Sequence, residues 1–218
     1  MSAWKPCPQP ERLVLEGRFC RLQPLSVEAH GDDLFAAATA EDADERFRWL
    51  PEVTPATRVE FDEWMANAAA SDDPLFFAVI DKRTSRAEGR QTLMRIDPAN
   101  GVIEVGNVFW GGAISRSPVT TEAYFLFAQY VFDVLGYRRF EWKCNNRNGP
   151  SKRAAERFGM TFEGVFRQAL VVKGENRDTA WYSLLDREWP ATKARFERWL
   201  APENFDSQGR QIATLNEI

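Results

Sequence analysis

The chain has 218 residues, of which 44% are hydrophobic and 28% charged, as in ordinary folded domains. This length suits a single domain over residues 1–218, with a core over about 11–190 and a C-terminal helix and tail over 187–218. The formal net charge of −4 gives no basic field for a nucleic acid. Without a membrane-length apolar run or a signal peptide, we expect a cytoplasmic protein that does not bind membranes.

The three cysteines, Cys7, Cys20 and Cys144, form no CxxC pair, and His30 is the one histidine that could join them. This pattern disfavours a zinc site or a disulfide framework and indicates a reducing compartment. We therefore expect no metal.

The first half of the chain changes from helical to strand-like patterns. Residues 1–11 are rich in proline and are expected to wrap the surface. The elements predicted next are a hairpin over 13–22, helices over 26–38 and 57–70 with a short helix and loop between them, and strands over 75–80, 87–96 and 102–110.

The second half begins with a long helix over 118–135 that stops at Gly136. The elements predicted after it are a strand over 139–144, a short helix after Asn148, strands over 162–172 and 179–185 with a turn across 173–176, a helix over 186–200, and a loose or partner-bound tail over 201–218. This order predicts a mixed α/β domain around one central sheet.

The short helix after Asn148 has a polar N-terminus. Asn148 is a suitable N-cap, Pro150 lies early in the helix, and Gly159 ends it. With Ser151 in the first turn, this helix end is a place to hold a polar ligand.

A second helix N-terminus follows the strand over 102–110. Ser117 is a natural N-cap and Pro118 a natural first residue, so the free N–H groups of this turn form an anion site suited to a pyrophosphate. A plain capped helix remains the alternative.

The Asn-x-x-Ser pattern at Asn148 and Ser151, the helix ending Gly159-Met160 and the strand beginning Phe162-Glu163-Gly164 resemble the GNAT acetyltransferases, most closely the RimJ/RimL-type branch. The resemblance covers about residues 11–190. It implies a GNAT-like, mostly antiparallel central sheet, splayed in the middle, with helices on both faces. It also implies transfer of an acetyl group from acetyl-CoA to a primary amine of a protein N-terminus or a small molecule, by direct attack in a ternary complex.

The resemblance also indicates the residues that hold acetyl-CoA. GNAT enzymes bind pyrophosphate with a Gln/Arg-x-x-Gly-x-Gly/Ala loop, whose glycines are missing here at Ser115, Pro118 and Thr120, and Arg116 is expected to compensate. The strand over 102–110 is expected to bulge and to pair with the pantetheine arm. The implied contacts are Phe109, Trp110, Arg116, Ser117, Pro118, Val119, Thr120, Thr121, Asn148 and Ser151.

Two residues are candidates for the proton transfers. Glu104 is the candidate base, with a salt-bridged or solvent-facing strand residue as the alternative. Ser151 is the candidate partner of the leaving thiolate, because the RimJ/RimL-type resemblance implies that its hydroxyl lies near the sulfur. Many GNAT enzymes use a tyrosine on this helix, and Ala155 takes its position here. The alternative for Ser151 is a first-turn residue that bonds a free backbone amide.

Four further interpretations stay open. Cys144 as a covalent nucleophile is less favoured than an inert buried thiol. The missing glycines leave room for a non-catalytic acyl-CoA-binding or regulatory module. Arg167 and Asp178 are expected to pair across the last hairpin, and a homodimer is left open, with Trp199 and residues 201–218 as candidate contacts.

Overall fold

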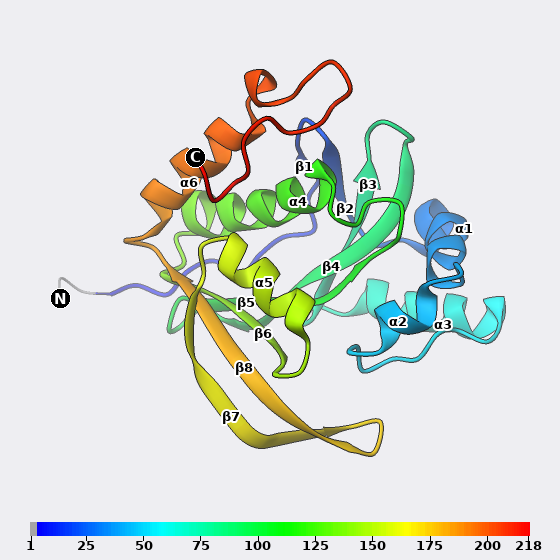
Figure 1. Ribbon diagram of the computed structural model, residues 1–218. Coiled ribbons are helices and arrows are strands. Elements are labelled where there is room, and N and C mark those ends of the chain that lie inside the picture. Colours follow the sequence, from blue (N-terminus) through cyan, green and yellow to red (C-terminus); the bar gives the residue numbers. More distant parts are fainter. Residues whose placement is uncertain (1–3) are drawn as a thin grey trace.

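The computed structural model describes residues 4–218 and contains one eight-stranded sheet (Figure 1). The strand order is β1-β2-β3-β4-β5-β6-β8-β7. Neighbouring strands are antiparallel except β5 and β6, which run parallel. The strands are β1 Leu15–Glu16, β2 Cys20–Pro24, β3 Leu75–Asp81, β4 Arg86–Asp97, β5 Val102–Trp110, β6 Arg139–Asn145, β7 Thr161–Val172 and β8 Glu175–Leu185.

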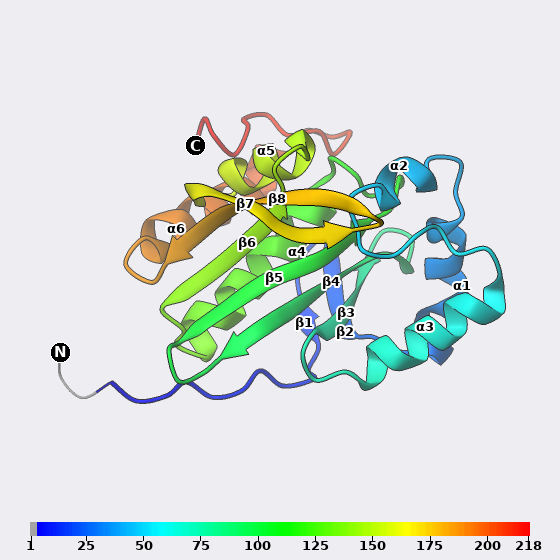
Figure 2. The same ribbon diagram turned by 90° about the horizontal axis from the view of Figure 1, so that it is seen from below.

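Helices cover both faces of this sheet, as Figure 2 shows. One face carries the larger apolar cluster, which includes residues of α4 and α6, and the other carries a smaller cluster built with α1 to α3. The helices are α1 Val27–Ala38, α2 Ala43–Phe47, α3 Arg58–Ala70, α4 Pro118–Gln129, α5 Gly149–Arg157 and α6 Trp189–Leu200; a π-helical turn over Tyr130–Val134 extends α4.

Side-chain caps fix where the helices begin. Ser26, Thr57, Ser117 and Asn148 each accept a hydrogen bond from a backbone N–H group of the first turn. At the far end of the long helix, Gly136 has a φ of 68°, which suits glycine best. The predicted positions of these helices are therefore confirmed.

The pairing of β5 with β6 is short. Val102 to Val105 pair with Arg139 to Trp142, and beyond these four residue pairs the strands no longer pair with each other. β5 stays paired with β4 up to Trp110, and β6 stays paired with β8 up to Asn145. The sheet is therefore mostly antiparallel and splayed in the middle, as predicted.

A bulge in β5 lies within the splayed region. The register between β4 and β5 shifts between the pairs Arg90–Phe109 and Thr92–Gly106, and Asn107 has a φ of 46°. An extra residue of this kind bends the strand and increases its twist. The expected bulge is therefore present, next to Gly106.

Parts of the C-terminal region differ from expectation. β8 begins at Glu175, so the hairpin turn is only Lys173-Gly174, and α6 begins at Trp189 rather than Asp186. The tail is not loose: Leu215 is fully buried and Trp199 Nε1 donates to Gln211 Oε1 at 3.0 Å. The prediction of Trp199 as an outer contact is also wrong, because its ring is buried within its own chain.

At the other end, residues 4–11 run along the surface as predicted, held by Trp4 Nε1 donating to Ala99 O at 2.7 Å. Residues 1–3 of that predicted segment lie outside the described residues. From residue 4 onward, no helix combines the length and apolar character that a bilayer crossing requires.

Candidate active site

Two helix N-termini flank the opening in the sheet. α4 follows the loop that leaves β5, and α5 follows the loop that leaves β6. Because β5 and β6 are parallel, both helices begin beyond the C-terminal ends of these strands, where the strands have separated. Helix N-termini carry unpaired N–H groups and partial positive charge, so the space between these two N-termini favours an anionic ligand.

The first turn of α4 is held in place by its own side chains. Ser117 Oγ donates to Ile114 O at 2.6 Å and accepts from the N–H of Val119 at 3.2 Å. Thr120 Oγ1 donates to Ser117 O at 3.1 Å. Arg116, immediately before the cap, is exposed and has a φ of 58°. Its cationic side chain therefore lies at the mouth of the turn that we predicted to bind phosphate.

The first turn of α5 presents a hydroxyl whose oxygen is already engaged. Asn148 Oδ1 accepts from the N–H of Ser151 at 3.1 Å, and Trp142 Nε1 donates to Ser151 Oγ at 2.9 Å. Among residues 4–218, Ser151 Oγ accepts no hydrogen bond from a backbone amide, which was the alternative role for this residue. A hydroxyl that accepts from an indole keeps its own proton for donation.

Side-chain contacts connect α4 and α5 directly. Arg157 Nη1 donates to Thr121 Oγ1 at 2.8 Å, and the rings of Tyr124 and Phe158 stack with centroids 4.3 Å apart. Thr121, predicted as a cofactor contact, is buried and occupied by this bond. These contacts fix the two helices relative to each other.

Glu104 lies in a buried ion network. Its side chain is on the last paired stretch of β5, opposite Glu141 of β6, and the residue is 5% exposed. Lys143 Nζ contacts Glu104 Oε2 at 2.7 Å and Glu141 Oε2 at 2.6 Å. Burial raises the pKa of Glu104, and Lys143 partly opposes that rise. Glu104 is therefore a salt-bridged carboxylate whose pKa lies above its usual range.

Glu104 and Ser151 lie on opposite faces of the sheet. Ile103 and Val105 pack in the larger cluster, so Glu104 between them points to the face covered by α1 to α3. Ser151 bonds Trp142, whose ring belongs to the larger cluster. The opening between β5 and β6 is the place where groups on the two faces can reach one ligand.

The two predicted cofactor contacts at the end of β5 have buried or half-buried side chains. Phe109 packs against Phe47 with centroids 4.9 Å apart, on the α1–α3 face. Trp110 Nε1 donates to Gln91 Oε1 at 3.3 Å, and Trp110 O accepts from Arg46 Nη1 at 2.9 Å. Any contact of Phe109 with the pantetheine arm would therefore use its backbone, because its ring faces the other way.

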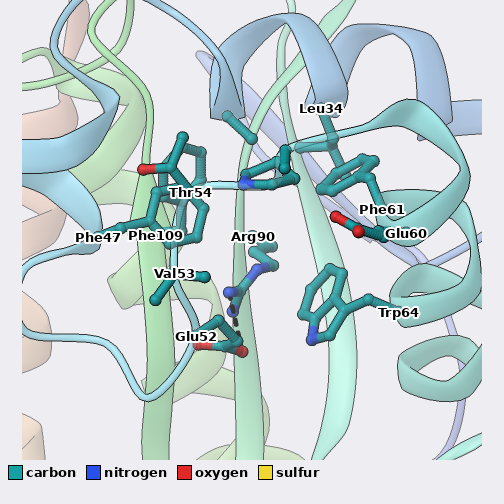
Figure 3. Close-up of a pocket in the computed structure, with 13 residues that line it drawn as sticks. Leu34, Phe47, Glu52, Val53, Thr54, Glu60, Phe61, Trp64, Arg90 and Phe109 are labelled. Carbon is teal, nitrogen blue, oxygen red and sulfur yellow. Dashed lines mark hydrogen bonds and ion pairs between the residues drawn. The ribbon is translucent and has the colours of Figure 1, made fainter. Parts of the chain in front are cut away.

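A pocket of about 320 Å³ lies between the sheet and the first three helices, and we call it the α1–α3 pocket (Figure 3). Most of its walls are apolar, and Arg90 and Glu52 form an ion pair within it at 3.2 Å. Its lining residues are Leu34, Ala38, Phe47, Glu52, Val53, Thr54, Pro55, Ala56, Glu60, Phe61, Trp64, Arg90 and Phe109.

Arg90 connects this pocket to the bulge. Its Nη1 donates to the carbonyl of Asn107 at 2.7 Å, and its guanidinium lies over the Trp64 ring with the centroid 4.4 Å away. Burial lowers the pKa of Arg90, and Glu52 opposes that effect. The pocket therefore shares a wall with the splayed half of β5.

The β7–β8 hairpin also contacts the face of the sheet that α1 to α3 cover. Lys173 Nζ, at its tip, donates to Phe47 O at 2.8 Å, and the ring of Trp181 lies 3.8 Å from Lys143 Nζ. The expected Arg167–Asp178 ion pair is not among the contacts of residues 4–218. Asp178 Oδ1 instead accepts from the N–H of Gln168 at 2.8 Å, because the bulge in β7 turns this backbone toward it.

Cys144 has the environment of an inert thiol. It is buried, and burial raises its pKa despite nearby Ser151 and Lys152, which lower it. A thiol with a raised pKa is a poor nucleophile. In residues 4–218, no group of three or more His, Cys, Asp or Glu side chains is placed to hold a metal ion.

Sequence reasoning did not find Lys143, Trp142 or Arg90 as site residues. Lys143 carries a weak signal, since it stands between the apolar Trp142 and Cys144 on a strand and so must face the other side. Arg90 carries none, because its role depends on the bulge at Asn107 on a different strand.

Comparison with known proteins agrees with this geometry. Residues 20–161 match the family model described as "Acetyltransferase (GNAT) domain". A crystal structure of a GCN5-related N-acetyltransferase from Brucella melitensis superimposes with a TM-score of 0.98 at 64% identity, covering 100% of this chain and 98% of that one. A probable GNAT-family acetyltransferase from Chromobacterium violaceum ATCC 12472 gives a TM-score of 0.81 at 37% identity, with 87% and 94% covered.

A curated relative is more distant. The "Putative ribosomal N-acetyltransferase YdaF" of Bacillus subtilis (strain 168) is 31% identical over 106 residues, which are 48% of this chain and 57% of that protein. The chain thus spans little more than half the length of this relative. The family match covers well over half of the chain, and the sheet has the splayed form that the resemblance implies. The chain therefore belongs to the GNAT family of acetyl-CoA-dependent N-acetyltransferases, in its RimJ/RimL-like group.

Proposed function

We propose that this chain transfers an acetyl group from acetyl-CoA to the primary amine of a protein N-terminus or a small molecule, by direct attack of the amine in a ternary complex. The observation that carries the proposal is the opening between β5 and β6, which lies between two capped helix N-termini. The α1–α3 pocket adjoins the same stretch of β5 and offers a place for the acceptor.

The residues at the opening suit a molecule with a pyrophosphate and an amide-bearing arm. The pyrophosphate is assigned to the first turn of α4, Ser117 to Thr121, and to the exposed Arg116. The arm is assigned to the unpaired edge of β5 near Phe109 and Trp110, and to Asn148. When bound, acetyl-CoA supplies an activated acyl carbon.

Two side chains are assigned to the chemical step. Glu104 accepts the proton that the ammonium group of the acceptor loses, and its raised pKa suits that task. Ser151 Oγ donates a hydrogen bond to the negative charge that develops on sulfur as the carbon–sulfur bond breaks and the carbon–nitrogen bond forms. The proton that the nitrogen loses as the amide forms passes to the departing thiolate. In this arrangement the amine arrives from the α1–α3 face, and the thiolate is stabilised from the α4 face.

A second candidate is a non-catalytic acyl-CoA-binding module. Pro118 lacks an N–H in the turn assigned to the phosphates, and Glu104 is tied to Lys143. Calorimetry with coenzyme A, followed by a thiol-release assay with acetyl-CoA over a panel of amines and N-terminal peptides, separates the two. Heat of binding with turnover on an amine supports catalysis, heat without turnover on any amine supports the module, and no heat from folded protein contradicts both.

A further inference from the structure

The α1–α3 pocket combines apolar walls with one buried cation. The cavity is lined by the buried side chains of Leu34, Phe47, Phe61 and Phe109, and the guanidinium of Arg90 reaches into it from β4 (Figure 3). An apolar pocket with one fixed charge binds a ligand that has an apolar body and one group of opposite charge. The buried charge here is positive.

The ion pair between Arg90 and Glu52 leaves one carboxylate oxygen of Glu52 without a partner among the described residues. The contact of Arg90 with Glu52 is a single one, from Nη2 to Oε1 at 3.2 Å, although a guanidinium can hold a carboxylate through two parallel bonds. The other oxygen, Glu52 Oε2, is buried and has no hydrogen-bond partner among the described residues. Glu52 is therefore a poor match for Arg90, and a better-placed carboxylate would gain bonds that Glu52 leaves unmade.

Glu52 lies on a loop, outside the sheet and the helices. Residues 51–57 form neither helix nor strand, and the adjacent Val53 is 68% exposed. Exchange of Glu52 for a carboxylate of the ligand keeps the charge of Arg90 paired, so it avoids the large cost of leaving a buried charge alone. The Glu52 carboxylate thus occupies the position beside Arg90 in which the carboxylate of a ligand would bind.

The position and size of the pocket limit what that ligand is. Arg90 holds the carbonyl of Asn107 at the bulge, so a carboxylate bound to Arg90 lies close to the splayed strand. The amine that is acetylated must therefore be near this carboxylate in the same molecule, as it is in an α-amino acid. A volume of about 320 Å³ lies at the lower end for ligand pockets and suits a single amino acid with its side chain.

We infer that the acceptor is an apolar α-amino acid, whose carboxylate binds Arg90 in place of Glu52 and whose side chain fills the α1–α3 pocket. The inference rests on the proposed function, because it identifies the amine that is acetylated. The amine then points toward the opening between β5 and β6. Peptide N-termini, which have an amide where the amino acid has its carboxylate, are disfavoured acceptors.

The test is a calorimetric titration with L-phenylalanine and L-leucine against their amides, with and without saturating coenzyme A. These pairs differ in the carboxylate alone, and no acetyl transfer is needed. We expect each acid to bind about tenfold more tightly than its amide, the ratio expected for a hydrogen bond to a charged group. Equal affinities, tighter binding of the amides, or no binding of either in both conditions would overturn the inference.

Variants of the pocket separate displacement of Glu52 from a general change in charge. Glu52→Gln removes the competitor for Arg90, so binding of the acids should tighten several-fold while that of the amides stays the same. The matched control is Glu60→Gln, which removes a carboxylate from the same lining without touching Arg90, and it should shift the acids far less. If Glu52→Gln weakens the acids and the amides alike, Glu52 itself holds the amine and the inference is wrong.

Arg90 can be tested without removing its charge. Arg90→Lys keeps a cation at the bulge but loses the planar fork, and we expect the preference for acids over amides to fall severalfold. Circular dichroism of the variant reports whether the sheet is intact. Binding of coenzyme A to the wild-type protein is measured in parallel. A wild-type protein that binds coenzyme A but no amino acid contradicts this inference and leaves the proposed function standing.

Discussion

The indole Nε1 of Trp142 donates a hydrogen bond to Ser151 Oγ at 2.9 Å, which joins the strand that borders the opening to the helix that flanks it. The bond orients the hydroxyl and uses one of its acceptor sites, so the hydroxyl proton points away from the indole nitrogen. The assignment of Ser151 as the partner of the leaving thiolate is a proposal, and this geometry gives it a measurable consequence.

Ser151→Ala is expected to lower kcat about 100-fold while the Kd for coenzyme A changes little, because a hydrogen bond to the developing thiolate acts on the chemical step. The thiol-release rate and calorimetry measure the two quantities. Trp142→Phe keeps the Ser151 hydroxyl but removes the bond that orients it, so this variant should lose less kcat than Ser151→Ala. Equal losses of rate and of coenzyme A affinity in Ser151→Ala would assign this residue to binding.

The pH dependence of the rate tests Glu104. A carboxylate base works when ionised, so the rate should rise with pH through the pKa of Glu104, which burial places above 4.5. Lys143 lowers this pKa, so Lys143→Met should move the acidic limb to higher pH. Glu104→Gln should remove the limb, and a profile that does not change in either variant excludes Glu104 as the base.

Glu163 makes stability depend on pH. Arg139 holds its carboxylate through two contacts, and this pairing, with a hydrogen bond from Ser183, lowers the pKa of Glu163 from 4.5 to about 2. A lowered folded-state pKa stabilises the protein above pH 4.5, and this contribution disappears as the pH falls from 4.5 to about 2. Urea unfolding across that window should show a steeper loss of stability for wild type than for Glu163→Gln; parallel curves would contradict the assignment.

The C-terminal tail is expected to contribute to stability. Leu215 is fully buried, so Leu215→Ala should lower the free energy of unfolding by about 2–5 kcal/mol. Ile212, in the same tail, is 70% exposed, and Ile212→Ala should change it by less than about 0.5 kcal/mol. Denaturant titration compares the two variants; similar small effects would mean that the tail detaches in solution.

The sequence was informative about elements whose signals are local. Caps such as Ser117 and Asn148, the stop at Gly136 and the short-range apolar patterns located the helices and most strands within a few residues. The splayed sheet was expected from the family resemblance alone, since it depends on how β5 and β6 diverge in space.

The remaining features depend on contacts between distant segments. The tail was expected to be loose or partner-bound, yet Trp199 and Asn204 hold it through side-chain bonds to Gln211 and Ala213. Likewise, Glu104 could be named as a candidate, but its partner Lys143 lies 39 residues away on a neighbouring strand. The roles of the catalytic and cofactor-binding candidates stay predictions until the variants above are measured.

The divergence of β5 and β6 gives this sheet two additional strand edges in its interior. Unpaired edges are usually found at the perimeter of a sheet, where they invite association with other chains and aggregation. Here the two edges face each other, and each strand keeps its hydrogen bonds to its outer neighbour, β4 or β8. A linear guest with its own amide groups can satisfy such an interior edge without recruiting another polypeptide.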